Sequence, residues 1–142
     1  MGIALALAVA GNVAAQGPWK MNLTCEAEKI VLRMDLYEES ITVPRMEMFG
    51  PMNGYLGGNI YGVWSITSFD IRNDREVTLR VSNDLGSETQ RIDLTQQTDS
   101  TWLLRFAGRN VVKRSDGKKL VKIPAELLMK KDVGEVGKVG KQ

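Results

Sequence analysis

Few residues of this 142-residue chain have the chemistry of a catalytic centre, because it contains no histidine and a single cysteine. Without histidine there can be no Ser-His-Asp or Cys-His relay and no His-ligated zinc or haem. The lone Cys25 excludes an internal disulfide. Acid–base chemistry would have to rest on carboxylates, lysine or tyrosine. We therefore expect no enzymatic activity, no catalytic residues and no bound metal or cofactor.

The residues of this chain that most resemble a metal-binding motif are methionines. Met46 and Met48 form a Met-x-Met pair whose sulfurs would project from one face of a strand, and Met52 follows closely. The pair resembles the Cu(I) site of small periplasmic copper-carrying barrels, which also use a histidine. Because this chain has none, we expect the methionines to serve as adaptable apolar side chains.

Acidic residues offer one arrangement with catalytic potential. Asp35 and the adjacent pair Glu38-Glu39 could supply the two carboxylates that glycoside hydrolysis needs. Neighbouring carboxylates in a turn are far more often solvated, so we interpret this segment as a surface turn.

The charge balance argues against nucleic acid as a partner. The chain has 19 Lys and Arg against 17 Asp and Glu, and the two signs are interleaved. One basic cluster stands out near the C-terminus, made of Lys113, Arg114, Lys118, Lys119 and Lys122, followed by Lys130 and Lys131. Lysines of this kind typically keep an edge strand from unwanted pairing. The alternative is a weak contact with an anionic surface such as lipid headgroups or lipopolysaccharide.

The first fifteen residues carry no charged side chain and contain an apolar run from Ile3 to Ala10. Eight residues are too few for a membrane span, which needs roughly 20, but they suit the apolar region of a secretory signal. Val13-Ala14-Ala15 supplies small residues for cleavage. We predict that residues 1–15 are a signal peptide, that the mature protein is secreted or periplasmic, and that no transmembrane segment exists. In the oxidising compartment outside the cytoplasm, the Cys25 thiol would have to be protected from oxidation, so we expect it to be buried.

The remaining chain has a hydrophobic period of two residues, which is typical of half-buried strands. Turn signals recur at intervals of about ten residues, the strongest being Asp116-Gly117. We expect about eight to ten antiparallel strands, whose edges are best removed by closing the sheet. The prediction is an all-β up-and-down barrel in one domain, residues 16–131, with a two-sheet sandwich as the runner-up. The alternating inward residues include Ile30, Leu32, Met34, Leu36, Val77, Leu79, Val81, Ile92, Leu94, Trp102, Leu104 and Phe106.

Three stretches depart from this pattern. Glycines from Gly50 to Gly58 predict a mobile rim loop followed by a short strand. Pro124 suits the first turn of a short helix from Ala125 to Lys131. Residues 132–142 have glycine at every third position and no useful apolar period, so we expect them to be disordered.

The segment Gly17-Pro18-Trp19-Lys20 is similar to the Gly-x-Trp signature that opens the first strand of lipocalins and related calycin barrels. The likeness to a small secreted bacterial barrel of this kind covers roughly residues 17–123. It implies that Trp19 plugs one end of the barrel and that Arg105, on a late strand, stacks across it. It also implies an exported barrel that holds a small apolar molecule.

Two classes of function therefore stay open. In the first, the barrel binds a small apolar ligand that enters beside Gly50 to Gly58, and the residues assigned to the ligand are Met46, Met48, Tyr55, Trp64 and Trp102. In the second, large side chains fill the interior and the barrel is an interaction or structural module that binds a protein partner through its outer face.

Overall fold

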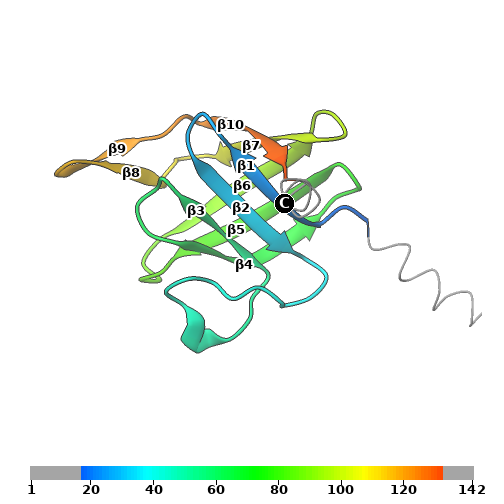
Figure 1. Cartoon of the computed structure of the whole chain (residues 1–142), viewed down its shortest axis with the longest axis horizontal. Coiled ribbons are helices and arrows are strands. Elements are labelled where there is room, and N and C mark those ends of the chain that lie inside the picture. Colours follow the sequence, from blue (N-terminus) through cyan, green and yellow to red (C-terminus); the bar gives the residue numbers. More distant parts are fainter. Residues whose placement is uncertain (1–16, 133–142) are drawn as a thin grey trace, which may run out of the picture.

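The computed structural model describes residues 17–132, and these form an all-β molecule (Figure 1). The strands are β1 (Lys20–Cys25), β2 (Ile30–Asp35), β3 (Gly54–Gly58), β4 (Trp64–Ile71), β5 (Glu76–Asn83), β6 (Thr89–Gln96), β7 (Thr101–Ala107), β8 (Lys113–Asp116), β9 (Lys119–Lys122) and β10 (Glu126–Lys131). Eight of them close into an antiparallel barrel in the order β1-β10-β7-β6-β5-β4-β3-β2. The predicted up-and-down barrel is confirmed, and the sandwich is not formed.

Two predicted segments fall outside this description. The signal peptide of residues 1–15 and nearly all of the tail of residues 132–142 lie outside the described residues. Between residues 17 and 132, no helix has the length and hydrophobicity needed to cross a membrane.

The barrel interior is a packed core, because the period-two pattern turns every second side chain inward. On β7, for example, Trp102, Leu104 and Phe106 are buried while Arg105 is exposed. Cys25 is also buried, as expected. Eight strands enclose a space that side chains can fill. The largest fully buried side chains are Trp19, Leu23, Ile30, Leu32, Met34, Leu56, Leu79, Ile92, Leu94, Trp102, Leu104 and Met129.

The predicted C-terminal helix from Ala125 to Lys131 is wrong, because this segment is the closing strand β10. It pairs with β7 on one side and with β1 on the other. Leu127 and Met129 are buried and Leu128 is exposed, which is a period-two pattern. The closed sheet requires a strand between β7 and β1, and this tertiary pairing overrides the helical preference of the local sequence.

The second half of the glycine-rich passage is the short strand β3, so a short strand is present here as expected. A Cβ atom on Gly54 or Gly58 would overlap a backbone carbonyl oxygen of the β2 side, and both residues have positive φ. Glycine is therefore required for β3 to approach β2 this closely. The first half of the passage, residues 50–53, belongs to the longer loop of residues 36–53, which contains the single helical turn of the described chain, η1 (Glu47–Phe49).

The two ends of the barrel differ in what they carry. The terminal end holds residues 17–19, both ends of loop 36–53 and the turns at 72–75 and 97–100. The hairpin end holds the turns at 26–29, 59–63 and 84–88 and the segment that contains β8 and β9. These two strands form a separate hairpin inserted between β7 and β10. Figure 1 shows it projecting beyond the barrel.

Candidate functional site

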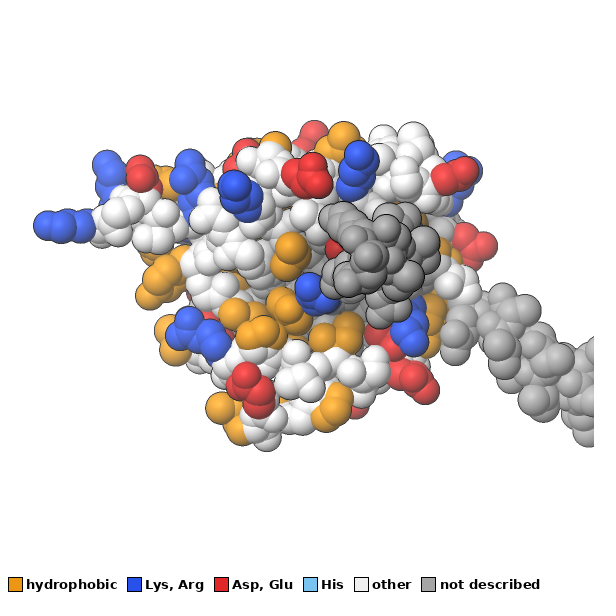
Figure 2. Space-filling view, viewed as in Figure 1, with side chains coloured by type: hydrophobic (Ala, Val, Ile, Leu, Met, Phe, Trp, Pro, Cys, Tyr) orange, Lys and Arg blue, Asp and Glu red, His pale blue; other side chains and the backbone are white. Residues whose placement is uncertain are grey.

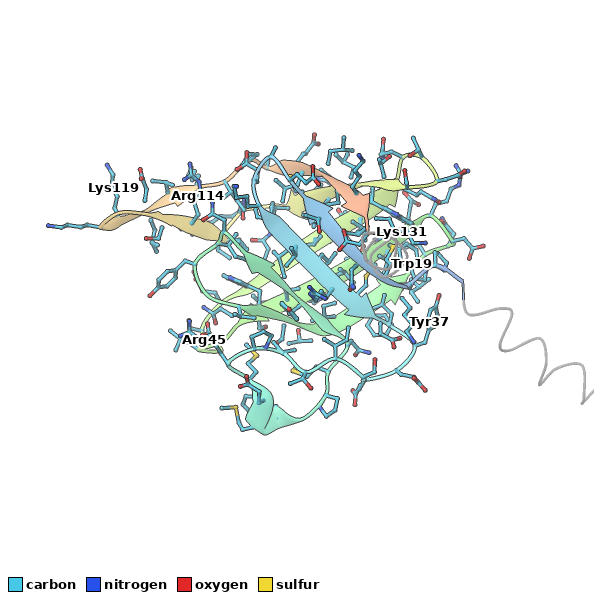
Figure 3. All side chains as sticks on the ribbon, in the orientation of Figure 1. Trp19, Tyr37, Arg45, Arg114, Lys119 and Lys131 are labelled. Atoms are coloured by element: carbon cyan, nitrogen blue, oxygen red, sulfur yellow. The ribbon has the colours of Figure 1, made fainter. Side chains whose placement is uncertain are left out.

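Trp19 and Trp102 pack together at the terminal end of the barrel. Their ring centroids are 5.1 Å apart with planes inclined at 59°, and each side chain is 1% exposed. The backbone N–H of Trp19 donates a hydrogen bond to Tyr37 Oη (3.0 Å), which ties the start of β1 to the loop after β2 (Figure 3). Trp19 therefore lies where the lipocalin resemblance places a barrel plug.

Arg105 does not stack across Trp19, contrary to what the resemblance implies. It points outward from β7, and its Nη2 lies 2.7 Å from Asp93 Oδ2 on β6. The physical reason is strand alternation, because Trp102 and Leu104 take the inward positions on either side in the pleat. The second tryptophan, Trp102, occupies the place against Trp19. Sequence reasoning assigned Trp102 to the interior but missed this pairing.

The buried tryptophans at the terminal end carry polar atoms without partners. Nε1 of Trp19 and Nε1 of Trp102 have no hydrogen-bond acceptor among the described residues. At the hairpin end, by contrast, Nε1 of Trp64 donates to the carbonyl oxygen of Tyr61 (3.1 Å). A buried donor without an acceptor destabilises a fold by roughly 1–3 kcal/mol. Any molecule bound against the Trp19–Trp102 pair would gain from offering an acceptor.

Asp35 is buried rather than solvated, and it organises the loop that follows β2. Its Oδ1 accepts hydrogen bonds from the backbone N–H groups of Tyr37 and Glu38, and its Oδ2 accepts one from Ser40 Oγ. Burial by itself would raise the pKa of the Asp35 carboxyl, but Ser40, the two N–H donors and the charge of Lys20 outweigh it and lower the pKa. Both oxygens are thus held by the loop, which gives this carboxylate a structural role.

The residues assigned to a ligand do not surround one cavity. Met46 is buried just before η1 whereas Met48, within it, is 75% exposed, so the expected shared strand face is absent. Tyr55 alternates with buried Leu56 on β3 and is half-buried on the outer face. Trp64 and Trp102 point inward, but at opposite ends of the barrel.

Local backbone structure explains why Met46 and Met48 do not share one strand face. Arg45 has a φ of 72°, and Ile41 pairs with Met52 through an isolated bridge. The chain between Ile41 and Met52 therefore turns back on itself and does not form the strand that a shared methionine face requires.

Exposed apolar side chains gather at the hairpin end. Tyr61 is 59% exposed, Leu85 is 80% exposed and Leu120 is 48% exposed, and each comes from a different segment. Two adjoining grooves lie here, and Leu120 lines one of them. The residues that line both grooves are Tyr61, Gly62, Asp84 and Leu85. Asp84 carries an ion pair to Arg45 Nε (3.1 Å). Figure 2 shows hydrophobic side chains at this side of the molecule, below the basic hairpin.

The hairpin itself is basic, and its two strands form a sheet separate from the barrel. From Lys113 to Lys122 it has five basic residues and one acidic residue, Asp116. None of the five forms an ion pair within residues 17–132, and Figure 3 shows Arg114 and Lys119 on the projecting strands. Its base is held by the backbone N–H of Tyr61, which donates to the carbonyl oxygen of Lys113 (2.7 Å). We call Tyr61, Leu85 and the hairpin together the hairpin surface.

Two further observations bear on function. Within the described chain, no group of three or more histidine, cysteine or acidic side chains is placed to hold a metal ion.

Comparisons of the sequence with models of protein families, with curated proteins and with solved structures found no match. The likeness to calycin barrels consequently rests on the closed eight-stranded antiparallel architecture.

Proposed function

We propose that this protein is an exported, non-enzymatic β-barrel that binds a protein partner through the hairpin surface. The observation that carries the proposal is the combination of exposed Tyr61, Leu85 and Leu120 with a projecting basic hairpin, on a barrel whose interior is already packed. The barrel is then a rigid scaffold and the hairpin surface is its functional part.

The composition of the hairpin surface indicates the kind of partner. Protein interfaces combine an apolar centre with a polar rim, and tyrosine and arginine are enriched in them. Here the apolar side chains lie beside five cations that have no carboxylate partner in the described structure. A partner that presents carboxylates around an apolar centre would complement this surface. The outer edges of β8 and β9, which pair only with each other, could also accept a strand from it.

Mutation of the apolar centre tests this proposal. Tagged protein is expressed in the native host, cross-linked and purified from the exported fraction. We expect a defined partner with the wild type and with Leu128→Ser, since Leu128 is 60% exposed on β10 outside the hairpin surface. The double variant Leu85→Ser/Leu120→Ser should lose the partner. Equal recovery with all three proteins would contradict the proposal.

The unpaired indole N–H groups of Trp19 and Trp102 favour one second candidate, the binding of a small ligand. A largely apolar molecule with one oxygen acceptor would satisfy them at the terminal end. The test is native mass spectrometry of protein from its host, followed by fluorescence titration with fatty acids. A ligand at the tryptophan pair requires a response that is lost in Trp102→Phe and kept in Trp64→Phe. If nothing co-purifies and no fatty acid changes the fluorescence, this candidate is excluded.

A further inference from the structure

The outer face of strands β4 to β6 carries a second feature, which shares no residue with the hairpin surface. A groove of about 170 Å³ lies over these strands, and it is lined by three arginines, Arg72, Arg80 and Arg91. Asp70 is the one acidic side chain in its lining. The groove therefore has an excess of positive charge.

Strand register brings two of these arginines directly opposite each other. Arg80 on β5 pairs with Arg91 on β6, and both side chains are exposed. Like charges at directly opposite positions destabilise a sheet. Their next neighbours along the same row are Ser68 on β4 and Ala107 on β7, whose short side chains offer no counter-charge and leave space above the sheet.

The neighbouring row of side chains holds part of this cluster in place. Thr78 Oγ1 donates to Asp93 Oδ1 (3.0 Å) and accepts a hydrogen bond from Arg72 Nε (3.2 Å). Arg91 Nε lies 3.5 Å from Asp93 Oδ1. Asp93 also pairs with Arg105, so one carboxylate is shared by two guanidinium groups.

Arg80 takes no part in these hydrogen bonds and ion pairs. Within residues 17–132, its side chain has neither an ion-pair nor a hydrogen-bond partner. A held Arg72, a held Arg91 and an uncommitted Arg80 thus face one small groove. Three guanidinium groups therefore line the groove with a single carboxylate, that of Asp70, and the site is partly preorganised for an anion.

We infer that this groove binds a tetrahedral oxyanion of the phosphate or sulfate class, held by Arg72, Arg80 and Arg91. Guanidinium groups offer forked donors that match the oxygens of such anions. An anion between Arg80 and Arg91 replaces their mutual repulsion with two attractions. The small volume suits a phosphoryl or sulfo group, free or as the end of a larger molecule. The site shares no residue with the hairpin surface, so the inference does not depend on the proposed binding of a protein partner.

The test is a titration of the whole protein with inorganic phosphate at constant ionic strength, with sodium chloride as the balancing salt. Arginine Nε–H resonances report binding by NMR. We expect saturable shifts at Arg72, Arg80 and Arg91, and an affinity at least tenfold lower in Arg80→Gln/Arg91→Gln. The matched control is Arg33→Gln, because Arg33 is exposed on the outer face of β2 opposite Asn22 and Tyr55, which carry no charge.

Each outcome decides the inference. Shifts that do not saturate, that chloride reproduces, or that Arg33→Gln reduces as much as the double variant would overturn it, because they indicate general screening. A second arm measures sedimentation with phosphatidylglycerol vesicles against phosphatidylcholine vesicles. Phosphate binding alone supports a soluble ligand, and vesicle binding that the double variant loses supports a lipid headgroup. The double variant should fold, since both arginines are exposed on the outer face of the sheet; an unchanged far-ultraviolet spectrum checks this.

Discussion

At the scale of single residues, the packed barrel depends on side chains whose surroundings are specific. Asp35 is 2% exposed and accepts three hydrogen bonds that turn the chain away from β2. Leu79 and Leu104 are fully buried in the core. Substitutions at these positions should therefore change stability through different physical causes, one electrostatic and one steric.

Replacing Asp35 by Asn should lower the free energy of unfolding by about 1–3 kcal/mol at pH 7, because three partly buried hydrogen bonds lose their charged acceptor. The folded-state pKa of Asp35 is lowered, so its contribution is complete above the ordinary aspartate pKa of about 3.9. The contribution disappears as the pH falls through the lower folded-state value. Urea unfolding at several pH values checks this.

The difference between wild type and Asp35→Asn should thus shrink in acid. Glu39→Gln, an exposed change in the same loop, is the control and should match the wild type throughout. A difference for Asp35→Asn that stays constant from neutral to strongly acidic pH would disprove the role of its charge.

Replacing Leu79 or Leu104 by Ala should destabilise the protein by about 2–5 kcal/mol, because each leaves a cavity in a packed core. Leu128→Ala, on the outer side of β10, should change stability by less than about 0.5 kcal/mol. Chemical denaturation of the three variants provides the measurement. Similar stability for all three would mean that the inward and outward faces are assigned incorrectly.

At the scale of elements, the hairpin of β8 and β9 is an insertion in a barrel that closes without it. Lys113 and Lys122 are cross-strand partners at its base, so their backbones are only roughly 5 Å apart. The barrel and the hairpin therefore form separable units, and the buried residues on either side, Val112 and Ile123, belong to the barrel.

Replacing residues 113–122 by a short Gly-Ser linker should leave the barrel folded and abolish partner binding. Circular dichroism and thermal unfolding measure the first effect, and cross-linking in the host measures the second. Loss of the cooperative transition on deletion would show that the hairpin is part of the folding unit. Retained partner binding would remove the hairpin from the functional surface.

The elements also show what the sequence can and cannot predict. The inward residues of β2, β5, β6 and β7 follow from alternation, which is a local property. The sequence predicts a helix where strand β10 forms, because the partners of this strand, β7 and β1, are distant in the chain. The opposition of Arg80 and Arg91 likewise depends on register between two strands. No local pattern encodes such a juxtaposition.

At the scale of the whole molecule, a closed barrel with a filled interior leaves its outer surface and its two ends for binding. At one end lie three exposed apolar side chains and five basic residues that form no ion pair with any other residue the structure describes. An exported protein of this form would meet its partner outside the cytoplasm, where Cys25 is protected by burial.

Export makes a prediction about the mature protein. N-terminal sequencing of material from the native host should begin at Gln16, because cleavage is expected after Ala15. Protein that still begins at Met1 and fractionates with the cytoplasm would contradict export.

Site-specific photo-cross-linking in the native host tests the central claim most directly. A photoreactive residue is placed in turn at Leu85 and Leu120, on the hairpin surface, and at Leu128, which is exposed elsewhere. The account predicts one defined protein adduct from Leu85 and Leu120 and none from Leu128. The absence of an adduct at the first two positions, or the same adduct from all three, would contradict it.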